Sequence, residues 1–278
     1  MIKNDFRGKA ILITGGTKGI GLAIALAFAR EGAHAYLTYK WGSASLDGIR
    51  ETFRNEGLLE PILIEADASN EEDTDMVLRR VKEDHEHIEV FVSNVSFSQL
   101  VSDESSYKKR SFLKSLEYSA WPFLGYSQKI KQTFGRYPHY ILGTSSFGVD
   151  TYYIQYDFVA AAKAVMETFC RYMGKHLLNE GVRVNILRSR PVATDSLRAT
   201  FGEGYEAFAK KHFGEEAFVT VEEVGEAALA MCSGLMDAMT GQVLMIDHGV
   251  TFHDNIQYMF EHRDEMGFEA LLAEVEGK

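Results

Sequence analysis

The chain has 278 residues, of which 46% are hydrophobic and 25% are charged, as in ordinary globular proteins. This composition excludes a disordered chain and a fibrous repeat, and the length is enough for one large domain with a substantial core. The formal net charge of −11 argues against nonspecific binding of nucleic acid through a basic surface.

The targeting signals and the cysteine content of the sequence indicate the same cellular compartment. Residues 1–9 are polar, and the sequence contains no run of about 18 apolar residues, so neither a signal peptide nor a membrane span is predicted. Cys170 and Cys232 are too few for a disulfide framework and favour a reducing environment. We therefore expect a cytoplasmic protein with no membrane or nucleic-acid partner.

Apolar runs alternate with amphipathic stretches along most of the chain. The predicted strands are Ala10–Thr14, His34–Thr38, Pro61–Glu65, Val90–Ser93, His139–Thr144, Val182–Leu187 and Gln242–Ile246. The predicted helices are Lys18–Glu31, Leu46–Glu56, Asn70–Val81 with Asn70 as N-cap, Ser111–Phe134, Tyr156–Asn179 and Val221–Ser233. Apolar strands separated by helices predict an α/β fold: a single doubly wound Rossmann-type domain whose seven-stranded parallel sheet carries helices on both faces.

The alternation stops near Gly249. We therefore predict one domain over residues 1–249 and a C-terminal extension over residues 250–278. The extension is polar and helix-prone, and it either caps the substrate site or forms part of a subunit interface.

A glycine-rich segment, Thr14-Gly15-Gly16-Thr17-Lys18-Gly19-Ile20-Gly21, follows the first predicted strand and opens the first helix. Glycines permit a tight turn there, and the helix N-terminus offers free N–H groups and a positive dipole to a pyrophosphate. The segment therefore predicts a dinucleotide site. Its expected contacts with the cofactor come from Gly15, Thr17, Lys18, Gly19, Ile20 and Gly21.

The end of the second strand indicates which dinucleotide is bound. An NAD-selective site usually places an acidic residue there to bind the ribose 2′-hydroxyl. Here the sequence reads Thr38-Tyr39-Lys40, and the next acidic residue is Asp47. Lys18 and Lys40 are cations suited to a 2′-phosphate, so NADPH is expected rather than NADH.

Taken together, the motifs over residues 7–249 resemble those of the short-chain dehydrogenase/reductase superfamily. They are TGGTKGIG at 14–21, Asp67 and Asn94 after the third and fourth strands, Ser145-Ser146, a Tyr/Lys pair, Val184-Asn185 with Thr194, and TGQVLMIDHG at 240–249. The resemblance implies that Asp67 contacts the adenine amino group and that Asn94 supports the cofactor loop. It also implies that Val192 and Thr194 lie near the nicotinamide carboxamide and the diphosphate.

The Tyr/Lys pair has an unusual spacing. Most of the superfamily carries Tyr-x3-Lys, but Val159 stands four residues before Lys163, and the nearest upstream tyrosine is Tyr156. The resulting Tyr-x6-Lys resembles the enoyl-thioester reductases, especially their NADPH-dependent branch. That resemblance implies that Tyr156 binds the enolate oxygen, that Lys163 binds the nicotinamide ribose and lowers the tyrosine pKa, and that Ser146 donates a further hydrogen bond. Tyr152 and Tyr153 are alternative donors.

Several positions depart from the superfamily pattern. Ser93-Asn94-Val95-Ser96 stands where Asn-Asn-Ala-Gly is usual, and Ser189-Arg190 replaces Pro-Gly before Thr194. Arg188 and Arg190 are expected to be solvated, with an acidic carrier protein or a coenzyme A phosphate as the alternative partner. The stretch after Thr194 holds four aromatic residues that either line an acyl pocket or close the core: Phe201, Phe208, Phe213 and Phe218.

The expected activity is hydride transfer from NADPH to the β-carbon of an enoyl thioester in fatty-acid or polyketide-like metabolism. The thioester carrier is coenzyme A or acyl carrier protein, and the expected assembly is a homotetramer or homodimer, as in the family that the chain resembles. The alternatives are an NADPH-dependent carbonyl reductase and a cofactor-binding protein without turnover. The nine histidines show no ligand spacing with cysteines or carboxylates, so no metal is predicted.

Overall fold

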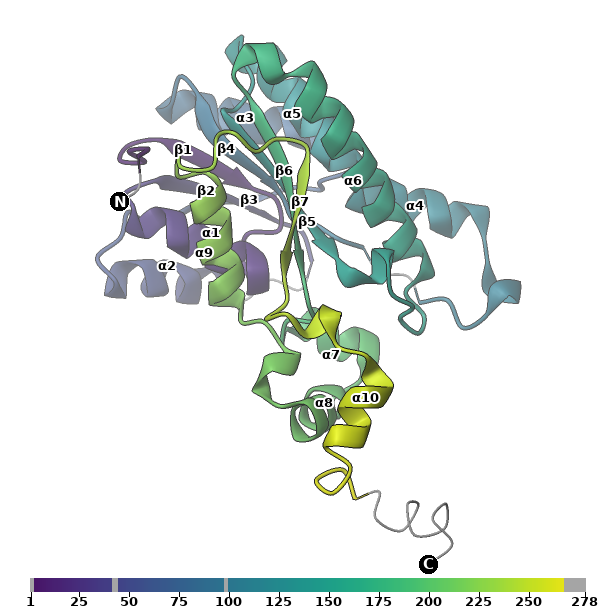
Figure 1. The fold of residues 1–278 in the computed structure, drawn as a ribbon. Coiled ribbons are helices and arrows are strands. Elements are labelled where there is room, and N and C mark those ends of the chain that lie inside the picture. The colour runs from purple at the N-terminus through teal and green to yellow at the C-terminus, as the bar shows by residue number, and fades with distance from the viewer. Residues whose placement is uncertain (1–2, 42–44, 98–99, 268–278) are drawn as a thin grey trace, which may run out of the picture.

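The computed structural model describes residues 3–41, 45–97 and 100–267. At its centre lies a sheet of seven parallel strands in the order β3-β2-β1-β4-β5-β6-β7 (Figure 1). The strands are β1 Ala10–Ile13, β2 His34–Tyr39, β3 Ile62–Glu65, β4 Ile88–Ser93, β5 Tyr140–Ser146, β6 Arg183–Ser189 and β7 Gln242–Ile246. The predicted sheet is confirmed, and its order reverses between β1 and β4, where open α/β sheets bind ligands.

Helices cover both faces of the sheet (Figure 1). One face carries α1 (Gly19–Arg30), α2 (Leu46–Asn55) and α9 (Val221–Met231). The other carries α3 (Glu71–Asp84), α5 (Trp121–Phe134) and α6 (Asp157–His176), with α4 (Lys109–Ser119) packed against α6. Each face has its own apolar core, centred on Phe28 on the first and on Phe123 and Met166 on the second.

The prediction of one helix over Ser111–Phe134 is wrong. The chain bends at Ala120, so that α4 ends at Ser119 and α5 begins at Trp121 with Pro122 in its first turn. Proline has no N–H for the carbonyl four residues earlier, and its ring collides with that carbonyl, so a continuous helix through Pro122 is disfavoured. The break leaves Tyr118 and Ser119 at the end of α4, next to the loop that follows β4.

Three short helices gather at the carboxyl end of the sheet: α7 (Asp195–Phe201), α8 (Tyr205–Phe213) and α10 (Asn255–Glu261) (Figure 1). In α10, the ring of Tyr258 stacks on Phe213 of α8, with the two centroids 5.4 Å apart. The predicted extension therefore packs against the segment after β6 as far as it is described, since residues 268–278 lie outside the described residues. The domain boundary at 249 stays a prediction.

Among the described residues, no helix combines the length and the apolar character that crossing a membrane requires.

Candidate active site

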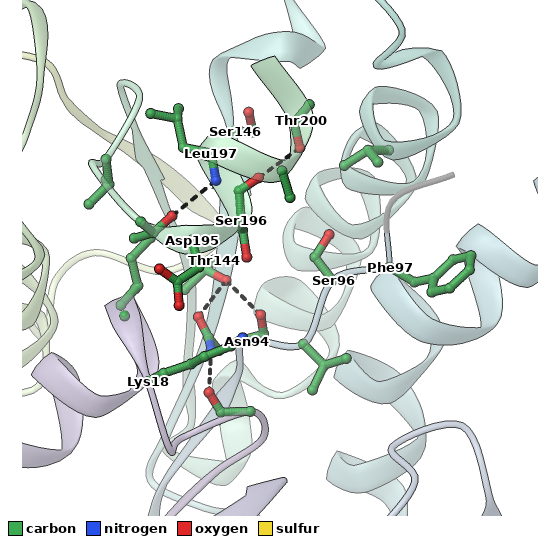
Figure 2. Close-up of a pocket in the computed structure, with 18 of the residues that line it drawn as sticks. Lys18, Asn94, Ser96, Phe97, Thr144, Ser146, Asp195, Ser196, Leu197 and Thr200 are labelled. Carbon is green, nitrogen blue, oxygen red and sulfur yellow. Dashed lines mark hydrogen bonds between the residues drawn. The ribbon is translucent and has the colours of Figure 1, made fainter. Parts of the chain in front are cut away.

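A cleft of about 800 Å³ lies at the carboxyl ends of the strands, around the point where the strand order reverses. Its walls come from the carboxyl ends of six strands, β1 to β6, and from the segments that follow them, represented by Gly15, Lys40, Ala66, Asn94, Ser146 and Arg190. Figure 2 shows Lys18, Asn94 and Thr144 on one side of this space and α7 residues, including Ser196 and Thr200, on the other. Segments far apart in the sequence thus meet in one site.

The glycine-rich loop has the conformation that a phosphate site needs. Gly15 and Gly19 have left-handed φ angles of 64° and 53°, which favour glycine. The first helix begins at Gly19, and the side chain of its N-cap, Lys18, caps no backbone N–H within the described part of the chain. The N–H groups of the first turn therefore remain available to an anionic ligand beside the lining residues Thr17 and Ile20.

Asn94 ties this loop to the centre of the sheet. Its Nδ2 donates to the carbonyl of Gly15 at 3.0 Å, and its backbone N–H donates to Thr14 Oγ1 at 3.0 Å. Thr144 Oγ1 in turn donates to Asn94 Oδ1 at 3.3 Å (Figure 2). Gly21 does not line the cleft; a side chain there would collide with the Gly15 carbonyl and with Asn94, so Gly21 serves the packing of the loop against α1.

The predicted adenine end of the cleft differs from the expectation at Asp67. Lys18 and Lys40 line it, as do Ala66 and Ala68, whereas Asp67 between them does not. The Asp67 carboxylate accepts from Ser69 N–H, from Ser69 Oγ and from the hydroxyl of Tyr118, at 2.7–2.9 Å. Burial acts to raise the Asp67 pKa, but these hydrogen bonds and the Lys40 charge outweigh it, and the pKa is lowered.

Tyr118 is a lining residue that sequence reasoning missed. Its ring lies between Trp41 and Phe97, with centroid distances of 5.7 and 5.4 Å, and all three rings line the cleft. The position of Tyr118 depends on the break between α4 and α5, which is why its sequence context carries no signal for it.

Tyr156 and Lys163 both line the cleft. Tyr156 is the N-cap of α6 rather than a residue of the helix, and its carbonyl accepts from Ala160 N–H at 2.9 Å. Lys163 lies two turns further along and is only 3% exposed. The spacing therefore brings both side chains to the same face of α6, at the same cleft.

Burial dominates the ionisation of this pair. It raises the pKa of Tyr156, a shift that the nearby Ser146 hydroxyl opposes. It lowers the pKa of Lys163 to about 8, against the opposing charge of Glu167. At neutral pH the phenol therefore keeps its proton and can donate it, and burial outweighs the lowering of the tyrosine pKa that was expected from Lys163.

Two further residues shape the surroundings of Tyr156. A β-carbon on Gly148 would lie 2.5 Å from Tyr156 Cδ1, so only glycine leaves room for the ring, and Gly148 N–H donates to Ser146 Oγ at 3.3 Å. Gln155, directly before Tyr156, has a left-handed φ of 63°, which is uncommon outside glycine and costs conformational energy. Neither residue was identified from the sequence.

The two alternative proton donors, Tyr152 and Tyr153, differ in their position relative to the cleft. Tyr152 is 82% exposed and lies outside the cleft, whereas Tyr153 lines it. The Tyr153 ring centroid lies 5.8 Å from that of Tyr156 and 5.6 Å from that of Phe201 in α7. Burial raises the pKa of Tyr153 to about 12.

Of the four phenylalanines after Thr194, only Phe201 is a lining residue within the described part of the chain. Phe218 is buried, Phe213 stacks on Tyr258, and Phe208 is exposed. Val192 and Thr194 also line the cleft, and Thr194 Oγ1 caps α7 by accepting from Leu197 N–H at 3.3 Å.

Arg188 contradicts the expectation of a solvated side chain. It is 5% exposed and donates from Nε to Glu167 Oε1 at 2.9 Å, with a second, shorter bond from Nη2 to Glu167 Oε2. Glu167, one turn after Lys163 in α6, also accepts from Ser145 Oγ at 2.5 Å, and Asp150 accepts from Arg188 Nη1. A buried ion pair thus supports the ends of β5 and β6 directly behind the lining residues.

The thiols of Cys170 and Cys232 are free and buried. Within residues 3–41, 45–97 and 100–267, no group of three histidine, cysteine or carboxylate side chains is placed to hold a metal ion.

A family match and the sequences of known relatives agree on one family for this chain. The family described as Enoyl-(Acyl carrier protein) reductase matches residues 15–251. The chain is 28% identical over 255 residues to the enoyl-acyl-carrier-protein reductase (NADH) FabI of Escherichia coli (strain K12), covering 87% of this chain and 94% of that protein.

Solved structures share the fold. One is 7 alpha-hydroxysteroid dehydrogenase complexed with NADH and 7-oxo glycochenodeoxycholic acid, with a TM-score of 0.77, 21% identity and coverage of 88% and 94% of the two chains. Another is a short chain dehydrogenase from Burkholderia cenocepacia J2315 in complex with NADP, with a TM-score of 0.76, 22% identity and coverage of 89% and 100%.

Proposed function

Because the chain belongs to the enoyl-(acyl carrier protein) reductase family, within the short-chain dehydrogenase/reductase oxidoreductases, we propose that it reduces an enoyl thioester with NADPH. The observation that carries the proposal is the placement of Tyr156 and Lys163, with six residues between them, at the same cleft. The phenol keeps its proton at neutral pH, and the lysine keeps most of its positive charge.

The residues of the cleft fit a nicotinamide dinucleotide. The open N-terminus of α1 and the left-handed Gly15 and Gly19 suit a pyrophosphate, with Thr194 close to Gly19 and Val192 also among the lining residues. Lys163 reaches the cleft from α6 and can bind a ribose hydroxyl. When bound, the cofactor supplies the hydride that the reduction requires.

The remaining chemistry falls to the protein. Reduction of the double bond places a hydride on the β-carbon and a proton on the α-carbon, while negative charge develops on the thioester oxygen. Tyr156 can donate a hydrogen bond to that oxygen, and the buried ammonium of Lys163 adds positive potential nearby. Ser146, half-buried at the end of β5, can donate a second bond.

Cofactor choice can be tested on the two lysines. We expect the double variant Lys18→Ala/Lys40→Ala to raise the Kd for NADPH about tenfold and to change the Kd for NADH less than threefold, because only NADPH carries the 2′-phosphate. Isothermal titration of both cofactors measures this. Lys129→Ala is the control, since Lys129 pairs with Asp75 away from the cleft. A wild type that binds NADH more tightly than NADPH would contradict the proposed preference.

The activity itself can be tested with two substrates side by side. We expect oxidation of NADPH by the wild type with an enoyl thioester and at least 100-fold slower oxidation with the matching β-ketoacyl thioester. Faster turnover of the keto substrate would make the protein a carbonyl reductase. That second candidate is favoured by one observation, the presence of Tyr153 in the cleft beside Tyr156. Binding of NADPH without turnover of either substrate would support a cofactor-binding protein.

The proposal includes the carrier and the assembly. The substrate is an acyl thioester of coenzyme A or acyl carrier protein, and the protein is a homodimer or homotetramer. Exposed apolar side chains on the outer surfaces of α4 and α6, Leu113, Phe169 and Tyr172, support burial of these helices between subunits.

A further inference from the structure

Arg190 is fixed at the wall of the cleft by its backbone. It directly follows β6, and its N–H donates to the Ile246 carbonyl at 2.9 Å. The next residue, Pro191, accepts from Val219 N–H at 3.2 Å, which holds the other side. The side chain therefore begins from a rigid position among the lining residues.

The guanidinium lacks the partners that a partly buried cation usually has. Its Nε is buried and has no hydrogen-bond partner among the described residues, and Nη2 reaches the Ala217 carbonyl only at 3.5 Å. No ion pair includes Arg190 in the part of the chain that the structure describes. The charge of Arg190 helps to lower the pKa of Asp247, but the oxygens of that carboxylate accept from Thr251 Oγ1 and from Gly249 N–H. A buried donor without a partner is costly, so a ligand acceptor is expected here.

A second arginine in the same cleft shows the contrast. Arg198 of α7 also lines the cleft, but it pairs with Asp195 at 3.3 Å and with Glu206 at 3.4 Å. Its charge is therefore already satisfied by the protein, whereas that of Arg190 is not.

The neighbours of Arg190 place it near the reacting end of the cleft. Its positive charge acts on Tyr153, opposing the effect of burial on the tyrosine pKa. Tyr153 lies against both Tyr156 and Phe201. The phosphate-binding features of the cleft, the α1 N-terminus with Lys18 and Lys40, follow β1 and β2 instead. Arg190 is thus on the side of the substrate.

We propose that Arg190 binds a carboxylate carried by the acyl chain of the substrate, so that the protein acts on acidic rather than purely aliphatic acyl thioesters. The planar guanidinium fork matches a carboxylate in a bidentate pair, and Nε is one of the donors that such a pair uses. This inference rests on the proposed function, since it names the substrate class of the same site.

Binding of matched acyl thioesters tests the inference without requiring turnover. The probes are glutaryl- and adipoyl-coenzyme A, each compared with its methyl-ended counterpart of equal length, pentanoyl- or hexanoyl-coenzyme A. They are titrated by calorimetry into the full chain saturated with NADP⁺. The wild type is expected to bind at least one carboxylate-ended probe about 10- to 100-fold more tightly than its counterpart. In Arg190→Gln this ratio falls to about one, and in Arg190→Lys it is partly kept. Arg198→Gln, the matched control, retains the wild-type ratio.

Three results would overturn the inference. The first is equal affinity of the wild type for carboxylate-ended and methyl-ended probes. The second is an equal loss of affinity for both probe types in Arg190→Gln, which would point to the coenzyme A phosphates as the ligand of Arg190. The third is a weakened affinity for NADPH in that variant. If Arg190→Gln does not fold, the affinity ratio of carboxylate-ended to methyl-ended probes in the wild type and in Arg190→Lys still tests the inference. Failure of the enoyl-reductase assay with the binding preference intact would reject the proposed reaction alone.

Discussion

Replacement of Tyr156 by phenylalanine is expected to lower kcat on an enoyl thioester by about 10²- to 10⁴-fold. The change removes one hydroxyl from a partly buried ring whose space is set by Gly148, so the fold and the cleft should be preserved. The Kd for NADPH should therefore change less than about threefold. Steady-state kinetics and cofactor titration on the same preparation measure both quantities.

The neighbouring tyrosines provide controls for this prediction. Tyr152→Phe should have wild-type activity, because Tyr152 points to solvent. Tyr153→Phe keeps the ring contacts with Tyr156 and Phe201 and should retain at least a tenth of the wild-type kcat. If Tyr153→Phe is the inactive variant and Tyr156→Phe is active, the proton donor has been assigned to the wrong residue.

The second large effect concerns stability. Glu167→Leu is expected to lower the free energy of unfolding by about 3 kcal/mol, because it leaves the Arg188 guanidinium buried without its main carboxylate partner. Asp150 retains one contact with Arg188 but is mostly exposed, so it replaces only part of the loss. Urea unfolding followed by circular dichroism measures the change.

Two control variants distinguish the loss of a buried ion pair from the loss of a solvent-exposed one. Glu56→Leu breaks the solvent-exposed pair with Arg30 and should cost less than about 1 kcal/mol. The double variant Glu167→Leu/Arg188→Leu should recover most of the stability, because no unpaired charge remains in the interior. A loss below 1 kcal/mol for Glu167→Leu alone would mean that Arg188 finds water or another partner.

The sheet and the glycine-rich loop could be predicted because their signals are local. Each strand is a short apolar run, and the loop carries its function in eight consecutive residues, 14–21. The break between α4 and α5 was missed although Pro122 marks it, because the apolar pattern continues on both sides of the proline.

The candidate site was only partly predictable for a different reason. Tyr156 and Lys163 stand on one helix, so their relation follows from spacing alone. The pair Glu167–Arg188 joins α6 to β6, and the contact of Gly148 with Tyr156 depends on how the chain turns after β5. Such contacts arise from tertiary packing, which no single segment encodes. The same holds for Arg190, whose lack of partners is visible only once its surroundings are assembled.

The cleft draws its lining from Gly15 to Val221, and this spread couples ligand binding to folding. A dinucleotide held by the segments after β1, β4 and β6 can bind only a chain in which these strands have already paired. By mass action, cofactor at 100 times its Kd would add about 2.7 kcal/mol to the stability of the entire domain. Saturating cofactor would thus restore most of the absolute stability that Glu167→Leu loses, although the difference from the wild type under the same conditions would remain.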